Sequence, residues 1–190
     1  IKPIKIDYCS FSGNKATDGC SISIIISDVS NLKPIDIDNC IFLSNAESSN
    51  GCIYYSFNPP SQGVSSTYSF RVANCRFEEN KAANEGSSIH ITIEQTQTQP
   101  INSIEITKCQ FYKNNGDSTN GGDIYYAVNP TPSEGTKSKT LLENSALLNI
   151  NDCNFTKSQS KEHGASIYLT IDKLESTSTE IKNCKFVEQQ

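Results

Sequence analysis

Hydrophobic residues recur at every second position over short runs of this chain, which is the period of a β-strand rather than of a helix. One run of about five residues appears in each of five successive segments. The runs are Ile22-Ile24-Ile26, Ile53-Tyr55-Phe57, Ile89-Ile91-Ile93, Ile124-Tyr126-Val128 and Ile167-Leu169-Ile171. Many short strands of this kind predict an all-β protein.

A second pattern precedes each run: two alternating apolar residues lead to a cysteine, and a phenylalanine follows two positions later. The cysteines are Cys9, Cys40, Cys75, Cys109, Cys153 and Cys184, and the phenylalanines are Phe11, Phe42, Phe77, Phe111, Phe155 and Phe186. Consecutive cysteines are 31, 35, 34, 44 and 31 residues apart, a spacing typical of stacked repeats. The alternation slips by one position before each cysteine, so the chain must turn a corner there for both patterns to face one interior.

We therefore predict a parallel β-helix of about five to six coils, with three short strands in each coil. The coils are expected at approximately 1–34, 35–68, 69–102, 103–145, 146–178 and 179–190, within one elongated domain. Neighbouring coils of such a solenoid lie about 5 Å apart. The six cysteines and the six phenylalanines should thus form two inward columns.

Two further cysteines, Cys20 and Cys52, lie outside this pattern. Eight cysteines in a secreted chain would usually form disulfides. Stacked thiols are the favoured interpretation here, because in-register side chains of adjacent coils lie slightly too far apart for a relaxed disulfide, and disulfides between coils are the alternative. Cys20 and Cys52 occupy different places in their motifs, so one is expected to point inward and the other outward. With no Cys-x-x-Cys sequence and two histidines, neither a metal site nor a cofactor is predicted.

Two short motifs resemble those of a known family. Phe-x-x-Asn stands at Phe11-Asn14, Phe42-Asn45, Phe77-Asn80 and Phe111-Asn114, and the fifth unit has Ser158 in place of the asparagine. A looser form of Gly-Gly-Ala-Ile stands at residues 19–22, 50–53, 86–89, 121–124 and 164–167. Together they resemble, over nearly the whole chain, the repeats of the polymorphic outer membrane proteins. The resemblance implies a right-handed parallel β-helix in an adhesin-like surface protein of a bacterium or a protist, and hence an extracellular or cell-surface location.

Charge and hydropathy restrict the partners. The formal charge of −5, without a Lys/Arg cluster, argues against nucleic acid. No apolar run approaches the ~18 residues that span a bilayer, so this segment is not expected to insert into a membrane. The sequence begins within one repeat and stops just after a Cys-x-Phe pattern. We expect either that further repeats of a longer chain continue it or that copies stack end to end into a filament.

The outward positions of the long strands contain a candidate binding surface. On four successive coils they are occupied by Tyr54, His90, Tyr125 and Tyr168. Such rings could contact a glycan or an apolar group of a cell-surface protein. The alternative is that they stabilise one another across strands. Asn154, in the only standard N-glycosylation sequon, is expected to point outward as a candidate glycosylation site.

Catalytic residue types do not recur on neighbouring coils. Glu94 and Asp172 come nearest to a carboxylate pair, two coil spacings or roughly 10 Å apart, and Asp123 is isolated. We therefore predict a non-enzymatic structural or adhesive surface element, whose partners are itself, further repeats, glycans or cell-surface proteins. The alternative is a carbohydrate-binding or carbohydrate-active β-helix protein of the pectin-lyase-like type.

Overall fold

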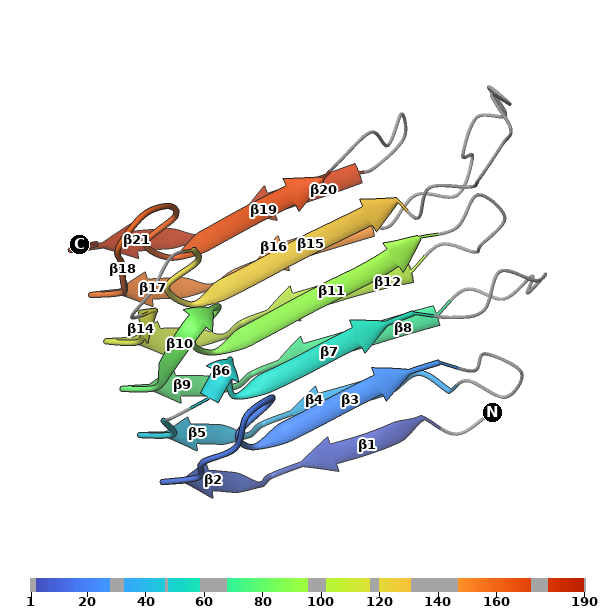
Figure 1. Cartoon of the computed structure of the whole chain (residues 1–190), viewed down its shortest axis with the longest axis horizontal. Helices are drawn as coiled ribbons and strands as arrows, with labels where there is room; N and C mark the ends of the chain where they lie inside the picture. The colour runs from blue at the N-terminus through green and yellow to red at the C-terminus, as the bar shows by residue number, and fades with distance from the viewer. Residues whose placement is uncertain are drawn as a thin grey trace.

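The computed structural model describes residues 3–27, 33–46, 48–58, 68–95, 102–116, 120–130, 147–171 and 178–189. These residues form 21 β-strands and no helix, and the strands pair in parallel. Successive coils stack along one axis, with the first and last strands at opposite ends (Figure 1). The predicted parallel β-helix is confirmed.

Four parallel sheets run along the stack, and within each sheet the strands lie in the order in which they occur in the sequence. The first sheet contains β1 (Ile4–Asp7), β4 (Ile35–Asp38), β8 (Tyr68–Ala73), β12 (Asn102–Thr107), β16 (Leu147–Asn151) and β20 (Ser178–Lys182). The second contains β2 (Ser10–Ser12), β5 (Ile41–Leu43), β9 (Arg76–Glu78), β13 (Gln110–Tyr112), β17 (Asn154–Thr156) and β21 (Lys185–Val187). The third, with the long strands, contains β3 (Ile22–Ile26), β7 (Ile53–Phe57), β11 (Ile89–Gln95), β15 (Ile124–Pro130) and β19 (Ile167–Ile171). The fourth contains β6 (Ser48–Asn50), β10 (Lys81–Glu85), β14 (Asn115–Gly116) and β18 (Gln159–Ser160).

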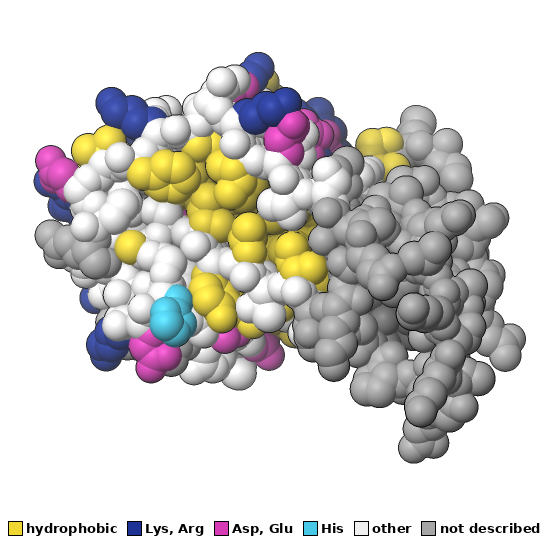
Figure 2. Space-filling view, turned by 90° about the horizontal axis from the view of Figure 1, so that it is seen from above, with side chains coloured by type: hydrophobic (Ala, Val, Ile, Leu, Met, Phe, Trp, Pro, Cys, Tyr) yellow, Lys and Arg dark blue, Asp and Glu magenta, His cyan; other side chains and the backbone are white. Residues whose placement is uncertain are grey.

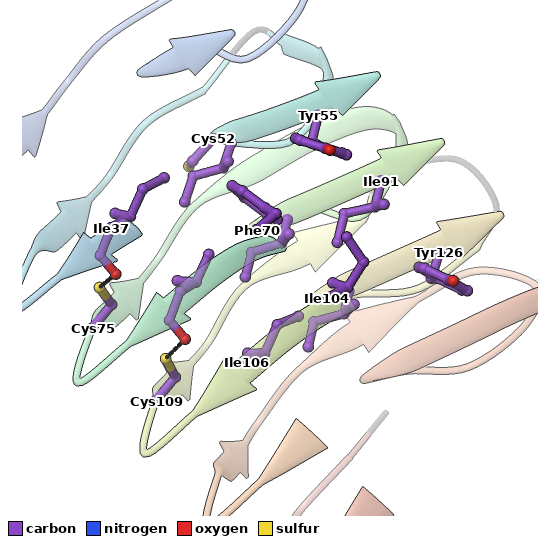
Figure 3. Packing of buried hydrophobic residues seen from close by; sticks show 14 of the residues in the cluster. Ile37, Cys52, Tyr55, Phe70, Cys75, Ile91, Ile104, Ile106, Cys109 and Tyr126 are labelled. Atoms are coloured by element: carbon purple, nitrogen blue, oxygen red, sulfur yellow. Dashed lines mark hydrogen bonds between the residues drawn. The ribbon is translucent and has the colours of Figure 1, made fainter. Parts of the chain in front are cut away.

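The interior is filled by columns of like side chains, because in-register pairing places each residue over its counterpart in the next coil. The six phenylalanines form one stack, with neighbouring ring centroids 4.6–5.0 Å apart and ring planes within 9° of parallel. Beside it, each of the six column cysteines donates its thiol to the carbonyl two residues earlier. Cys75 also reaches the carbonyl of Ile37 in the preceding coil, at 3.8 Å (Figure 3).

A ladder of asparagines lies at the corner after each phenylalanine. Asn45, Asn80 and Asn114 are buried, and the Nδ2 of each donates to the phenylalanine carbonyl of the preceding coil at 3.0–3.1 Å. The Oδ1 of each accepts both the backbone N–H and the Nδ2 of the asparagine before it, at 3.0 Å. The Phe-x-x-Asn motif therefore satisfies the polar groups of a buried corner. It also holds adjacent backbones together where the fourth sheet begins, a sheet that adds to the three predicted strands.

The ladder changes in the last two units. In the fifth unit the buried Ser158 takes the asparagine position, and the Oδ1 of the fully buried Asp123 accepts from Nδ2 of Asn114 at 2.8 Å. In the sixth, Nε2 of Gln189 donates to the carbonyl of Phe155 at 3.0 Å and resumes the pattern. A motif defined by asparagine misses Gln189, although the same spacing from Phe186 points to it.

Left-handed backbone conformations mark the two corners that flank each second-sheet strand. Before the strand, φ is 51–54° at Tyr8, Asn39, Asn74, Lys108, Asp152 and Asn183. After it, φ is 51–65° at Gly13, Ser44, Glu79, Lys113, Lys157 and Glu188. Asparagine tolerates this conformation, but lysine and tyrosine adopt it here because the paired neighbouring coils impose it.

Replacing Lys108 by glycine is expected to raise the free energy of unfolding by about 0.5–1 kcal/mol. Lys108 is exposed with φ 53°, and glycine removes the Cβ penalty of this conformation while its more flexible unfolded state cancels part of the gain. Urea unfolding followed by circular dichroism measures the change. Lys108→Ala keeps the Cβ and is the matched control; equal effects of the two substitutions would contradict this explanation.

Candidate functional site

The aromatic ladder, Tyr54, His90, Tyr125 and Tyr168, lies on the outer face of the third sheet. Ring centroids along it are 5.3, 4.7 and 5.7 Å apart. His90, however, is only 3% exposed, and the three tyrosines are partly buried. The expectation of rings open to a partner is therefore wrong for His90.

A row of polar residues contacts the ladder along its length. This polar row consists of Asp18, Asn50, Glu85, Asn120 and His163, whose backbones pair between coils. Nδ2 of Asn50 donates to Oδ1 of Asp18 at 2.7 Å. Glu85 is hydrogen-bonded to the side chains of Asn120 and Tyr125, and the ring of His163 lies 6.0 Å from that of Tyr168.

Glycine residues allow the polar row to pass close to the outer face of the third sheet. The residue after each member of the row is a glycine with φ between 48° and 67°. A Cβ at Gly86 would lie 2.8 Å from the backbone nitrogen of Tyr125 and 3.0 Å from its Cβ. Glycine at Gly86 is thus required both by the left-handed turn and by the closeness of the backbone and Cβ of Tyr125 in the next coil.

Burial sets the protonation states of the ladder. It lowers the pKa of His90 to about 4, so the ring is neutral at pH 7, and Nδ1 lies 3.4 Å from the carbonyl oxygen of Glu85. Burial also raises the pKa of Glu85, against the hydrogen bonds from Asn120 and Tyr125. The pKa of Tyr125 is raised to about 12, first by burial and then by the charge of Glu85. Neither His90 nor Tyr125 changes charge near neutral pH.

This geometry favours the packing interpretation of the ladder over the binding interpretation. A ligand that stacked on the rings would first have to displace the polar row, together with the hydrogen bonds of Glu85. Stacked rings on adjacent strands stabilise a sheet. A role in ligand binding stays a prediction for the partly exposed Tyr54, Tyr125 and Tyr168.

Of the two carboxylates that come nearest to a catalytic pair in the sequence, Glu94 lies within the described residues and makes a structural contact. Glu94, on β11, accepts a hydrogen bond from Nδ2 of Asn129 at 3.1 Å. Asp172 lies outside the described residues. The two arginines of the chain are both paired with carboxylates. Nη1 of Arg71 lies 2.7 Å from Oδ1 of Asp36. Arg76 is paired with Glu78 of its own strand.

The eight cysteines are free thiols. Cys20 and Cys52 are both buried and their thiols are hydrogen-bonded to each other, so the expectation that one points outward is wrong. Strand alternation does not apply there, because a left-handed glycine begins a turn and the second unit has one residue fewer before the strand. The backbone N–H groups of Ser21 and Ile22 accordingly both donate to the carbonyl of Cys52. Burial raises the pKa of Cys52 well above the ordinary thiol value. Among the described residues, no cluster of three or more histidine, cysteine or carboxylate side chains is placed to hold a metal ion.

Asn154 is exposed at the start of β17. The neighbouring Phe155 is buried in the phenylalanine stack, so Asn154 and Thr156 share the outer face of the second sheet. Whether Asn154 carries a glycan stays a prediction.

Comparisons with protein-family models, curated proteins and solved structures found no match for this chain. Of the residues that the structure describes, none belongs to a helix long and apolar enough to cross a membrane. The geometry of the chain's own residues is therefore the basis for assigning a function.

Proposed function

We propose that this chain is a non-enzymatic structural element of a surface protein, a β-helical rod that is extended by coils packing against its end faces. The observation that carries this proposal is the end face of the last coil, where the internal columns reach the surface. Phe186 is 48% exposed there and Ile181 43%. With Ile167 and Leu169 they line an apolar hollow of about 400 Å³, and hydrophobic side chains gather on this face (Figure 2).

Backbone hydrogen bonding supports the same role for the end face. Strands β18, β19, β20 and β21 are the last strands of their sheets, so each has one edge without a partner among the described strands. Such edges pair readily with further strands. A coil placed on this face would continue the phenylalanine stack beyond Phe186 and bury the hollow beside it.

The first coil presents a matching surface. Ile4, in β1, is 50% exposed, and Phe11, in β2, is the first ring of the phenylalanine stack. The first coil of a second copy, or a further repeat of a longer chain, would therefore place like side chains over like columns. Because such a contact joins two different faces, it propagates into a filament unless rotation closes it into a ring.

Assembly of the 190-residue chain tests the proposal. We expect its mass, measured by sedimentation velocity and light scattering, to rise with concentration through end-on association. Phe186→Asp should keep the chain monomeric, because a carboxylate would be buried without a partner in the stacked interface. Leu43→Asp, at an exposed site on the flank, should associate like the wild type. A wild-type chain that is monomeric at high concentration, or association that Phe186→Asp leaves unchanged, would refute the stacking.

The cell-surface part of the proposal is supported by the resemblance of the repeats to those of surface proteins. It is tested separately, by antibody labelling of intact cells that produce the protein. Labelling that appears only after the cells are permeabilised would contradict it.

A further inference from the structure

A groove of about 300 Å³ lies on the outer face of the second sheet, away from the end faces. The residues that line it are Arg76, Gln110, Phe111, Tyr112, Asn154 and Thr156. In-register pairing of β9, β13 and β17 places Arg76, Gln110 and Asn154 in one outward column, with Glu78, Tyr112 and Thr156 in the next. The ring of Phe111 is buried in the stack, so its backbone lies between the two columns. The groove crosses three coils, about 10 Å at ~4.8 Å per coil.

The groups that line the groove match the surface of a sugar. The carboxamides of Gln110 and Asn154 each donate and accept hydrogen bonds, as does the hydroxyl of Thr156, and sugar hydroxyl and acetamido groups do the same. Tyr112 adds an aromatic ring, which can pack on the apolar face of a pyranose. Nζ of Lys113 lies 5.1 Å from the centroid of this ring.

The charges of the groove indicate a neutral ligand. Arg76 is the one charged residue among those that line it, and its Nη2 lies 2.5 Å from Oε2 of Glu78. The guanidinium charge is therefore already paired within β9. An acidic polysaccharide would have to compete with Glu78 for it, whereas an uncharged sugar needs only the donors and acceptors on either side.

The sequon provides a second, independent observation. Asn154 is the candidate acceptor of a carbohydrate chain in the sequon Asn154-Phe155-Thr156, and it is exposed and itself lines the groove. We propose that this groove binds a neutral, N-acetylated sugar, either as a free oligosaccharide or as the first residues of a glycan attached to Asn154. This role goes beyond rod assembly, because it uses the flank of the rod rather than its ends.

The first experiment uses the unglycosylated chain produced in a bacterium and labelled with ¹⁵N. Titration with tetra-N-acetylchitotetraose is expected to shift the side-chain amide signals of Gln110 and Asn154 in NMR spectra, and tetragalacturonate is not. Absence of any shift with the neutral tetrasaccharide, or shifts with the acidic one alone, would overturn the proposal.

Substitutions in the groove test which groups bind the sugar. Gln110→Ala and Tyr112→Ala should each weaken binding at least tenfold, since one removes a donor and an acceptor and the other removes the ring. Leu43→Ala lies in the same outward column as Tyr112, two coils away, and should bind like the wild type. Amide spectra of the variants establish that they are folded. Folded groove variants with wild-type affinity would overturn the assignment of the groove.

A third measurement distinguishes the two sources of sugar. The chain is produced in a cell that performs N-glycosylation, and occupancy of Asn154 is measured by mass spectrometry. If glycosylated protein no longer binds the free tetrasaccharide, the attached glycan occupies the groove. If the glycosylated protein binds the tetrasaccharide with unchanged affinity, a free saccharide is the ligand. Either conclusion holds only if the unglycosylated chain binds the tetrasaccharide in the first experiment.

Discussion

Replacing Phe111 by alanine is expected to lower the free energy of unfolding by about 3–5 kcal/mol. Phe111 is 1% exposed and stacked between Phe77 and Phe155, with ring centroids 5.0 and 4.7 Å away. The substitution removes a buried ring and two stacking contacts at once. The cavity cannot close by collapse, because the backbone pairing of β9, β13 and β17 fixes the spacing of the coils. Urea unfolding followed by circular dichroism measures the loss.

The same stack provides the matched control. Phe186 has a ring neighbour on one side, Phe155 at 4.9 Å, and is 48% exposed, so Phe186→Ala should cost less than half as much as Phe111→Ala. Because solenoid repeats interact with their nearest neighbours, hydrogen exchange should show that Phe111→Ala weakens the third, fourth and fifth coils most. Equal losses for the two variants would mean that the stack is not the source of the stability.

The strands and columns could be predicted because they follow patterns that are visible in the sequence, the two-residue alternation within a strand and the repeat from coil to coil. Ile89, Ile91 and Ile93 alternate with polar residues, and in a solenoid each must lie over its counterpart one coil away. The fourth sheet has no such signal. The strand β10, Lys-Ala-Ala-Asn-Glu, shows no apolar alternation, and it pairs because the asparagine ladder brings the backbones together.

The candidate site was predictable in register but not in exposure. The alternation places Tyr54, His90 and Tyr125 on the outer face of the third sheet, where they stack. Their burial depends on the path of the polar row after a left-handed turn, and the strand period does not describe such a path. The same limit applies to Cys20 and Cys52, which meet because one unit is a residue shorter than its neighbours.

The place of Asp123 beside the asparagine ladder could not be predicted from the sequence. In the sequence it is an isolated carboxylate, 35 residues before Ser158. In the fold it lies at the place where Ser158 is too short to continue the asparagine ladder, and its Oδ1 accepts the amide of Asn114. Oδ2 of Asp123 and the hydroxyl of Ser158 are both buried, and neither makes a hydrogen bond of normal geometry with the described residues. A buried carboxyl group in this setting makes stability depend on pH.

The wild-type protein is expected to lose stability as the pH rises from about 4 to about 8. Burial raises the pKa of Asp123 to about 8 from 3.8, against smaller opposing effects of Ser158 and Asn114. In this range the folded state holds a proton that the unfolded state has released, so each pH unit lowers the free energy of unfolding by up to about 1.4 kcal/mol. The dependence from this group ends above pH 8, where both states are deprotonated. Asp123→Asn should remove it, because the amide stays neutral while its Oδ1 still accepts from Asn114.

Urea unfolding of the wild type and of Asp123→Asn at pH 5 and pH 8 measures this effect. The variant is expected to be more stable than the wild type at pH 8 by several times its advantage at pH 5. Asp123→Ser, which copies Ser88 and Ser166 at the equivalent place of other units, should also lose the pH dependence but lacks the acceptor for Asn114, and should therefore be less stable than Asp123→Asn. Glu162→Gln removes an exposed carboxylate and serves as the control for net charge. If Asp123→Asn and the wild type lose stability in parallel between pH 5 and pH 8, Asp123 is ionised in the folded protein and the explanation from burial fails.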